Sequence, residues 1–269
     1  MKRWLVCLIL FGAAIGCVTT GPGGKTSLVL ISTGQEVALG QAMAHEVDST
    51  EKALPDPQWQ AYLNEVGQKL VSVCDRKDIQ YHFTVIQSDQ INAFAAPGGY
   101  VYFYTGVLGM MDNEAEMAAV MAHELSHVVA RHGAKRLQAA MGASLAYQLV
   151  MGDSSSAVFR TAVGIGMNLL FAGYSRENER EADEYGVTYM VRAGYDPAAM
   201  ETMFDKLAAN GTSSNAFEKL VSSHPETQER IANTKATIGR QQPLPPNLQL
   251  GRDRYQQMKK RLPVIKPKS

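Results

Sequence analysis

Cysteine is scarce in this sequence: 3 of the 269 residues are cysteine, too few for a fold that depends on a disulfide framework. An excess of charge of either sign is also absent, because 26 basic residues balance 26 acidic ones. This balance argues against a nucleic-acid-binding protein. The hydrophobic fraction of 45% is that of an ordinary globular protein.

Apolar runs long enough to cross a membrane are missing as well. A membrane-spanning helix needs about 20 apolar residues. The apolar stretches around Leu145 and Ile165 are shorter, because polar side chains such as Gln148 and Arg160 interrupt them. We interpret both stretches as helices of the core or of a lid.

The N-terminus carries a shorter apolar run. Lys2 and Arg3 precede about a dozen apolar residues, which indicates a secretory signal peptide over 1–16. The run ends in small residues before Cys17 and resembles the lipobox of bacterial lipoproteins, although Ala14 stands where leucine is usual. We therefore predict a lipid anchor on Cys17 and a flexible tether over 17–34. A plain signal peptide with an incidental cysteine is the alternative.

The rest of the chain predicts a mainly helical domain with one small sheet. Residues that alternate with period 2 indicate strands near 81–85 and over 100–104, the second with three tyrosines on one face. We place the domain at 35–240, and we interpret 241–269, which is Pro-rich and basic, as a solvated or loosely docked tail. Helices are expected over 35–47, 57–73, 113–132, 134–151, 158–171, 176–192, 197–209 and 225–239.

The helix over 113–132 contains the motif His123-Glu124-Leu125-Ser126-His127. Imidazoles at positions i and i+4 project from one helix face and hold Zn²⁺, and the glutamate between them is placed to accept a proton from water. Asn113 with Glu116 resembles an N-terminal capping box, and Gly133 suits a C-terminal stop.

A hydrolytic zinc site needs three protein ligands, so one more is required beyond His123 and His127. His132 lies on the opposite side of an ideal helix from His123 and His127. We assign it to the helix end, where an imidazole interacts favourably with the helix dipole. Glu179 is the better candidate. On a helical wheel it shares the apolar face of a later helix with Asp183, and buried carboxylates require partners.

The two carboxylates have different expected partners. A zinc ion satisfies Glu179, and the N–H of a ligand imidazole satisfies Asp183. The other acidic residues of this helix, Glu177, Glu181 and Glu184, fall on the opposite face and are expected to be solvated.

The sequence resembles the M48 metallopeptidases of the HtpX, OMA, BepA and LoiP type, in particular the small bacterial lipoproteins among them. The resemblance is carried by the segments above together with Asn92-Ala93-Phe94-Ala95, Pro97-Gly98-Gly99 and Ser223-His224-Pro225. The resemblance implies a mainly helical, gluzincin-like zincin domain of the α+β class, with the small sheet next to the motif helix. It implies one Zn²⁺ per chain. The implied zinc ligands are His123, His127 and Glu179; the catalytic set is Glu124 as general base, Asp183 behind a ligand, and His224 facing the site together with Arg230.

His224 has two functional interpretations and one structural one. It donates a hydrogen bond to the oxyanion during turnover, or it occupies the open zinc position at rest, or it belongs only to the cap of the helix that begins at Pro225.

The predicted function is a zinc endopeptidase of the bacterial cell envelope that acts on unfolded or damaged envelope proteins. Val18 is not the aspartate that retains lipoproteins in the inner membrane, so we expect a periplasm-facing lipoprotein of the outer membrane. The strand over 100–104 has two interpretations. An exposed edge of this strand would pair with extended substrates through main-chain hydrogen bonds, or its tyrosines serve only to pack the sheet. The competing functions are a lipoprotein chaperone with a structural zinc and a zinc hydrolase of small molecules.

Overall fold

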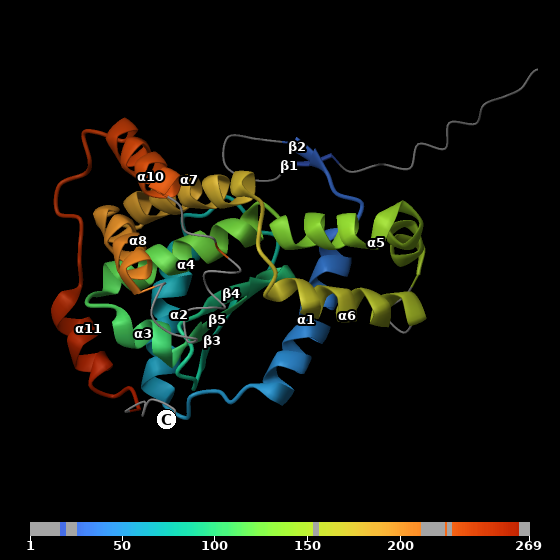
Figure 1. Ribbon diagram of the computed structural model, residues 1–269, viewed down its shortest axis with the longest axis horizontal. Coiled ribbons are helices and arrows are strands. Elements are labelled where there is room, and N and C mark those ends of the chain that lie inside the picture. The colour runs from blue at the N-terminus through green and yellow to red at the C-terminus, as the bar shows by residue number, and fades with distance from the viewer. Residues whose placement is uncertain (1–16, 20–25, 153–155, 211–223, 225–227, 264–269) are drawn as a thin grey trace, which may run out of the picture.

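Figure 1 shows the computed structural model, which describes residues 17–19, 26–152, 156–210, 224 and 228–263. The predicted signal peptide over 1–16 lies outside these residues. Two short strands, β1 (Cys17–Thr19) and β2 (Thr26–Leu28), pair antiparallel before the first helix. The helices are α1 (Thr33–Thr50), α2 (Pro57–Val71), α3 (Thr105–Met110), α4 (Glu114–Val129), α5 (His132–Met151), α6 (Ala157–Leu170), α7 (Arg176–Arg192), α8 (Ala198–Asn210), α10 (Gln228–Arg240) and α11 (Arg252–Lys259).

The small sheet contains β3 (His82–Ile86), β4 (Ala93–Ala96) and β5 (Tyr100–Tyr104) in the order β3-β5-β4. β5 runs parallel to β3 and antiparallel to β4, so it is the central strand of this sheet and β4 is at an edge. The hypothesis that β5 offers a free edge to substrate was therefore wrong. Its tyrosines pack the sheet instead: Tyr102 and Tyr104 are buried.

A short 3₁₀ turn, η2 (Pro97–Gly99), joins β4 to β5. Gly98 has φ 77°, which favours glycine, and a Cβ there would lie 2.9 Å from Cα of Val37. The turn thus packs directly on α1. It also contacts α4, so the loop beside the sheet is held from both sides.

Helix α4 lies at the centre of the molecule, between α7 and the sheet (Figure 1). Its residues are buried on nearly every side, with contacts to α2, α8 and β4 as well as α7. Gly186 of α7 leaves room for Met200 of α8, because a Cβ at position 186 would lie 2.7 Å from Cε of Met200. The α+β class, mainly helical with one small sheet beside the motif helix, is confirmed.

The two apolar stretches form α5 and α6, which pack on each other and on α1. Leu39, Leu137 and Ala162, one from each helix, are buried in one cluster. Within the described part of the chain, none of the helices combines the length and apolarity needed to cross a membrane.

The C-terminal segment was interpreted as a solvated or loosely docked tail; residues 241–250 are largely exposed, but α11 is fixed to the core. Tyr255 of α11 is fully buried, and its hydroxyl donates to the carbonyl of Leu108 (2.6 Å). The indole of Trp59 donates to the carbonyl of Met258 (3.0 Å). The basic composition misled us because the lysines and arginines lie around one large aromatic anchor, which fixes the segment to the core.

Candidate metal centre

Helix α4 carries the HExxH motif, and residues next to each end of this helix determine where it begins and where it stops. At the start, the side chain of Asn113 accepts from the N–H of Glu116 (3.0 Å), as the sequence predicted. The helix ends earlier than expected, at Val129. The residue that follows in the left-handed conformation is Arg131 (φ 56°) rather than Gly133.

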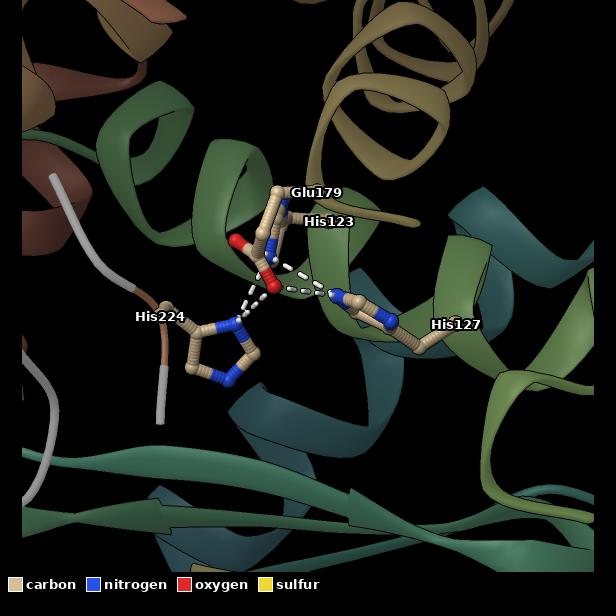
Figure 2. A group of neighbouring side chains, drawn as sticks. All are labelled: His123, His127, Glu179 and His224. Atoms are coloured by element: carbon tan, nitrogen blue, oxygen red, sulfur yellow. Dashed lines mark hydrogen bonds and ion pairs between the residues drawn. The ribbon is translucent and has the colours of Figure 1, made fainter. Parts of the chain in front are cut away.

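Four side chains from three segments converge beside α4 (Figure 2). His123 and His127 come from α4, Glu179 from the first turn of α7, and His224 from the segment before α10. One nitrogen or carboxylate oxygen from each residue lies within 4.8 Å of the others, and all four residues are buried. The Nε2 atoms of His123 and His127 are 3.1 Å apart.

This donor set fits a metal ion. The Nδ1 atom of His123 faces Asp183 (2.9 Å) and that of His127 faces His132 (2.9 Å), so the Nε2 lone pairs of both rings point to the centre. Two lone pairs and a carboxylate repel one another unless a cation lies between them. Two imidazoles and one carboxylate are the donors of catalytic zinc sites.

The electrostatics of the donors agree with this. Burial lowers the pKa of His127 well below its usual value, which keeps the imidazole neutral. Burial alone would raise the pKa of Glu179, but His224, His127 and His123 lower it well below its usual value. Its Oε2 accepts no hydrogen bond of regular geometry, although Nη1 of Arg230 lies 2.9 Å away.

Asp183 lies directly behind His123 and is itself held by Arg230. Its Oδ1 accepts from Nδ1 of His123 (2.9 Å) and from Nη2 of Arg230 (2.7 Å), and its Oδ2 accepts from Nε of Arg230 (2.8 Å). Burial would raise the pKa of Asp183, but the guanidinium and His123 lower it overall. The carboxylate is therefore ionised and able to orient the ring.

Glu124 lies next to the four converging side chains without joining them. Its Oε1 is 3.5 Å from Nε2 of His224, and the backbone of Ala95 on the edge strand β4 acts to lower the pKa of its carboxyl. Burial raises the pKa of Glu124, and His224 and His123 offset part of this. In the metal-free protein burial lowers the pKa of His224, but Glu179 and Glu124 raise it to about 9.

Comparison with known proteins agrees with this arrangement. The model of peptidase family M48 matches residues 57–238, which include the motif helix, Glu179 and His224. The chain belongs to peptidase family M48. The predicted family is thus confirmed.

Three relatives show how far the similarity extends. The beta-barrel assembly-enhancing protease of Escherichia coli (strain K12) is 28% identical, and the match covers 91% of this chain and 54% of that protein. Metalloprotease LoiP of the same strain is 28% identical, with 84% of this chain and 94% of that protein covered. The mitochondrial metalloendopeptidase OMA1 of Schizosaccharomyces pombe is 34% identical, with 63% of this chain and 50% of that protein covered. The chain thus spans about half the length of the first and the third.

His132 lies at the M48 site and not simply at a helix end, so this expectation was wrong. Its Nδ1 is 2.9 Å from Nδ1 of His127, and its Nε2 is 3.2 Å from Oε2 of Glu181. A wheel for one continuous helix placed it on the far side, but the left-handed Arg131 breaks the helix just before it. Glu181 was also expected in solvent and instead faces His132, whereas Glu177 and Glu184 are exposed as predicted.

Tyr174 is a site residue that the sequence analysis missed. Its ring stacks on His127 with centroids 4.0 Å apart, and the guanidinium of Arg136 lies 4.3 Å from the centroid of the tyrosine ring. Burial raises its pKa, so the hydroxyl stays protonated. It lies in the link between α6 and α7, where no periodicity or motif marks it.

An apolar pocket opens beside His123, Glu124 and His224. Its walls come from α4 and α8. The apolar side chains lining it are Ala119, Val120, Met200, Met203, Phe204 and Leu207.

Proposed function

We propose that this chain is a zinc-dependent endopeptidase of the bacterial cell envelope. The observation that carries the proposal is the position of Glu124: a buried carboxylate next to the converging donors that is not one of them. A structural zinc site has no use for such a group, whereas hydrolysis needs a base near the metal. The names of the M48 relatives, which are proteases of bacteria and mitochondria, support the proposal.

In this proposal His123, His127 and Glu179 hold one Zn²⁺. When bound, the ion supplies a Lewis acid that polarises a carbonyl and lowers the pKa of water. Glu124 accepts the proton of the attacking water and returns it to the leaving amine, which its raised pKa favours. Asp183 fixes the ring of His123 through Nδ1.

The substrates we propose are unfolded or damaged envelope proteins. The pocket between α4 and α8 is apolar and opens beside the converging donors, so it offers a contact surface to an apolar side chain of the substrate. Unfolded chains expose such side chains, whereas folded ones bury them. We further propose that a lipid on Cys17 holds the enzyme at the outer membrane, facing the periplasm.

The endopeptidase proposal is tested on unfolded casein. Glu124→Gln should keep zinc, the melting temperature and the fold while it loses proteolysis. The control is Glu177→Gln, an exposed glutamate of α7, which should cleave at the wild-type rate. Full activity of Glu124→Gln refutes the mechanism. If wild type with zinc cleaves neither casein nor peptides but prevents aggregation of unfolded proteins, the chain is a chaperone.

For His224 the contacts favour the resting-ligand form. Its Nδ1 lies 3.2 Å from Nε2 of His123 and 3.0 Å from Oε1 of Glu179, among the atoms that would bind the ion. We therefore propose that His224 would be a further ligand of the ion at rest and would leave it when substrate binds. His224→Ala should then raise the rate of casein cleavage with zinc retained. A loss of about 10² to 10³ in kcat instead identifies an oxyanion donor.

A further inference from the structure

Behind His127 lies a chain of hydrogen bonds that the proposed mechanism does not use. Nδ1 of His127 is 2.9 Å from Nδ1 of His132, whose Nε2 is 3.2 Å from Oε2 of Glu181. The hydroxyl of Tyr185 donates to the other oxygen of Glu181 (2.8 Å). The side chain of His132 is fully buried, whereas 13% of the Glu181 side chain is exposed.

The carboxylate at the end of this chain sets the direction of every hydrogen bond. A carboxylate only accepts, so Nε2 of His132 carries the proton. In a neutral imidazole the other nitrogen is then an acceptor, and the N–H that it receives comes from Nδ1 of His127. The remaining nitrogen of His127, Nε2, keeps its lone pair for a metal.

We propose that His132 and Glu181 are positioning residues, which orient the ring of His127 and select the tautomer that binds zinc. The inference rests on the proposed zinc site. It adds a second hydrogen-bonded group behind a ligand imidazole, and this group differs from the one behind His123. Behind His123 a buried carboxylate, that of Asp183, contacts the ring directly. Behind His127 a neutral imidazole is interposed, so the negative charge lies farther from the centre and partly in solvent.

The backbone at Arg131 is what brings His132 into this position. Its φ of 56° is uncommon for a residue other than glycine. Nε of Arg131 donates to Oε2 of Glu36 (2.7 Å), and Nη2 donates to the carbonyl of Ile31 (2.5 Å). These two contacts, both buried, stabilise the turn that directs His132 back toward His127.

The test compares two glutamates of α7. Glu181→Gln lets an amide donate to His132, which permits the reversed chain of hydrogen bonds and a proton on Nε2 of His127. Glu184→Gln is the matched control, because it removes the same charge from an exposed position on the same helix. Zinc affinity is measured by competition with a chromophoric chelator, and nitrogen NMR of the zinc-free protein reports which nitrogen of His127 carries the proton.

We expect Glu181→Gln to bind zinc about 10- to 100-fold more weakly and Glu184→Gln to bind as wild type. We also expect the proton of His127 to be on Nδ1 in wild type and shared between both nitrogens in Glu181→Gln. Equal affinity of the two variants, or weaker affinity with the proton still on Nδ1, overturns the relay. Neither readout uses substrate, so wild-type protein that binds zinc but cleaves nothing would refute only the endopeptidase function.

Discussion

Replacing Arg230 should destabilise the metal-free protein strongly, because this side chain neutralises two buried carboxylates. It makes two hydrogen bonds with Asp183 (2.7 and 2.8 Å) and an ion pair with Glu179 (2.9 Å), and it is 6% exposed. Removing one partner of a buried ion pair costs about 3–5 kcal/mol, because the other charge stays buried without compensation. We therefore expect Arg230→Met to lower the free energy of unfolding by about that amount.

The assay is urea unfolding of the zinc-free protein at neutral pH. Arg240→Met is the control, since Arg240 lies on the same helix α10 and forms an exposed ion pair with Glu184. We expect Arg240→Met to lower the free energy of unfolding by no more than about 1 kcal/mol. If Arg230→Met lowers the free energy of unfolding no more than Arg240→Met does, the buried ion pair does not stabilise the protein as we expect. Adding Asp183→Asn to Arg230→Met should restore part of the lost stability, because it removes one of the two uncompensated charges while that of Glu179 remains.

The same pair predicts a pH dependence. Burial acts to raise the pKa of Asp183, but Arg230 lowers it overall, so the folded-state value lies below the unfolded value of about 4. The pair therefore stabilises the folded protein fully above that pH and loses its contribution as the pH falls through the lower, folded-state value. The difference in stability between wild type and Arg230→Met should shrink correspondingly in acid.

Further predictions concern the metal, the pocket and the anchor. Glu179→Ala should weaken zinc binding without unfolding the protein, which metal analysis after dialysis measures; unchanged stoichiometry and affinity would contradict the ligand assignment. Val120→Phe fills the apolar pocket and should reduce kcat/KM at least about tenfold for peptides with a large apolar residue beside the cleaved bond, while peptides with alanine there are spared. Equal losses for both peptides would exclude the pocket as a subsite. Cys17→Ser should release the protein from the membrane fraction or leave it unprocessed, and wild-type protein found free in the periplasm would contradict a lipid anchor.

The sequence sufficed for those parts of the site that follow from regular geometry. Spacing within one helix was enough to place His123 beside His127, and the wheel of α7 was enough to separate Glu179 from Glu177, because both arguments assume ideal helices that the structure contains. Two strands of the small sheet were predictable from alternation and a turn, whereas its place beside the motif helix was implied by the family resemblance.

The remaining features depend on departures from regularity or on contacts between distant segments. His132 was misplaced because Arg131 adopts a conformation that its residue type does not announce. The order of the strands could not be read from local alternation, which is the same for a central strand and an edge strand. Tyr174 and Tyr255 are functional or structural only through partners far away in the chain.

The turn at Arg131 also links the assembly of the metal centre to the N-terminal segment. His132 faces His127 while Arg131 is held by Glu36 at the start of α1 and by Ile31 just before it. If His132 positions His127 as we propose, docking of that segment also places the acceptor for the N–H of His127. On the proposed zinc site, we therefore expect zinc affinity to depend on the docking of the beginning of the domain, more than 80 residues from the motif.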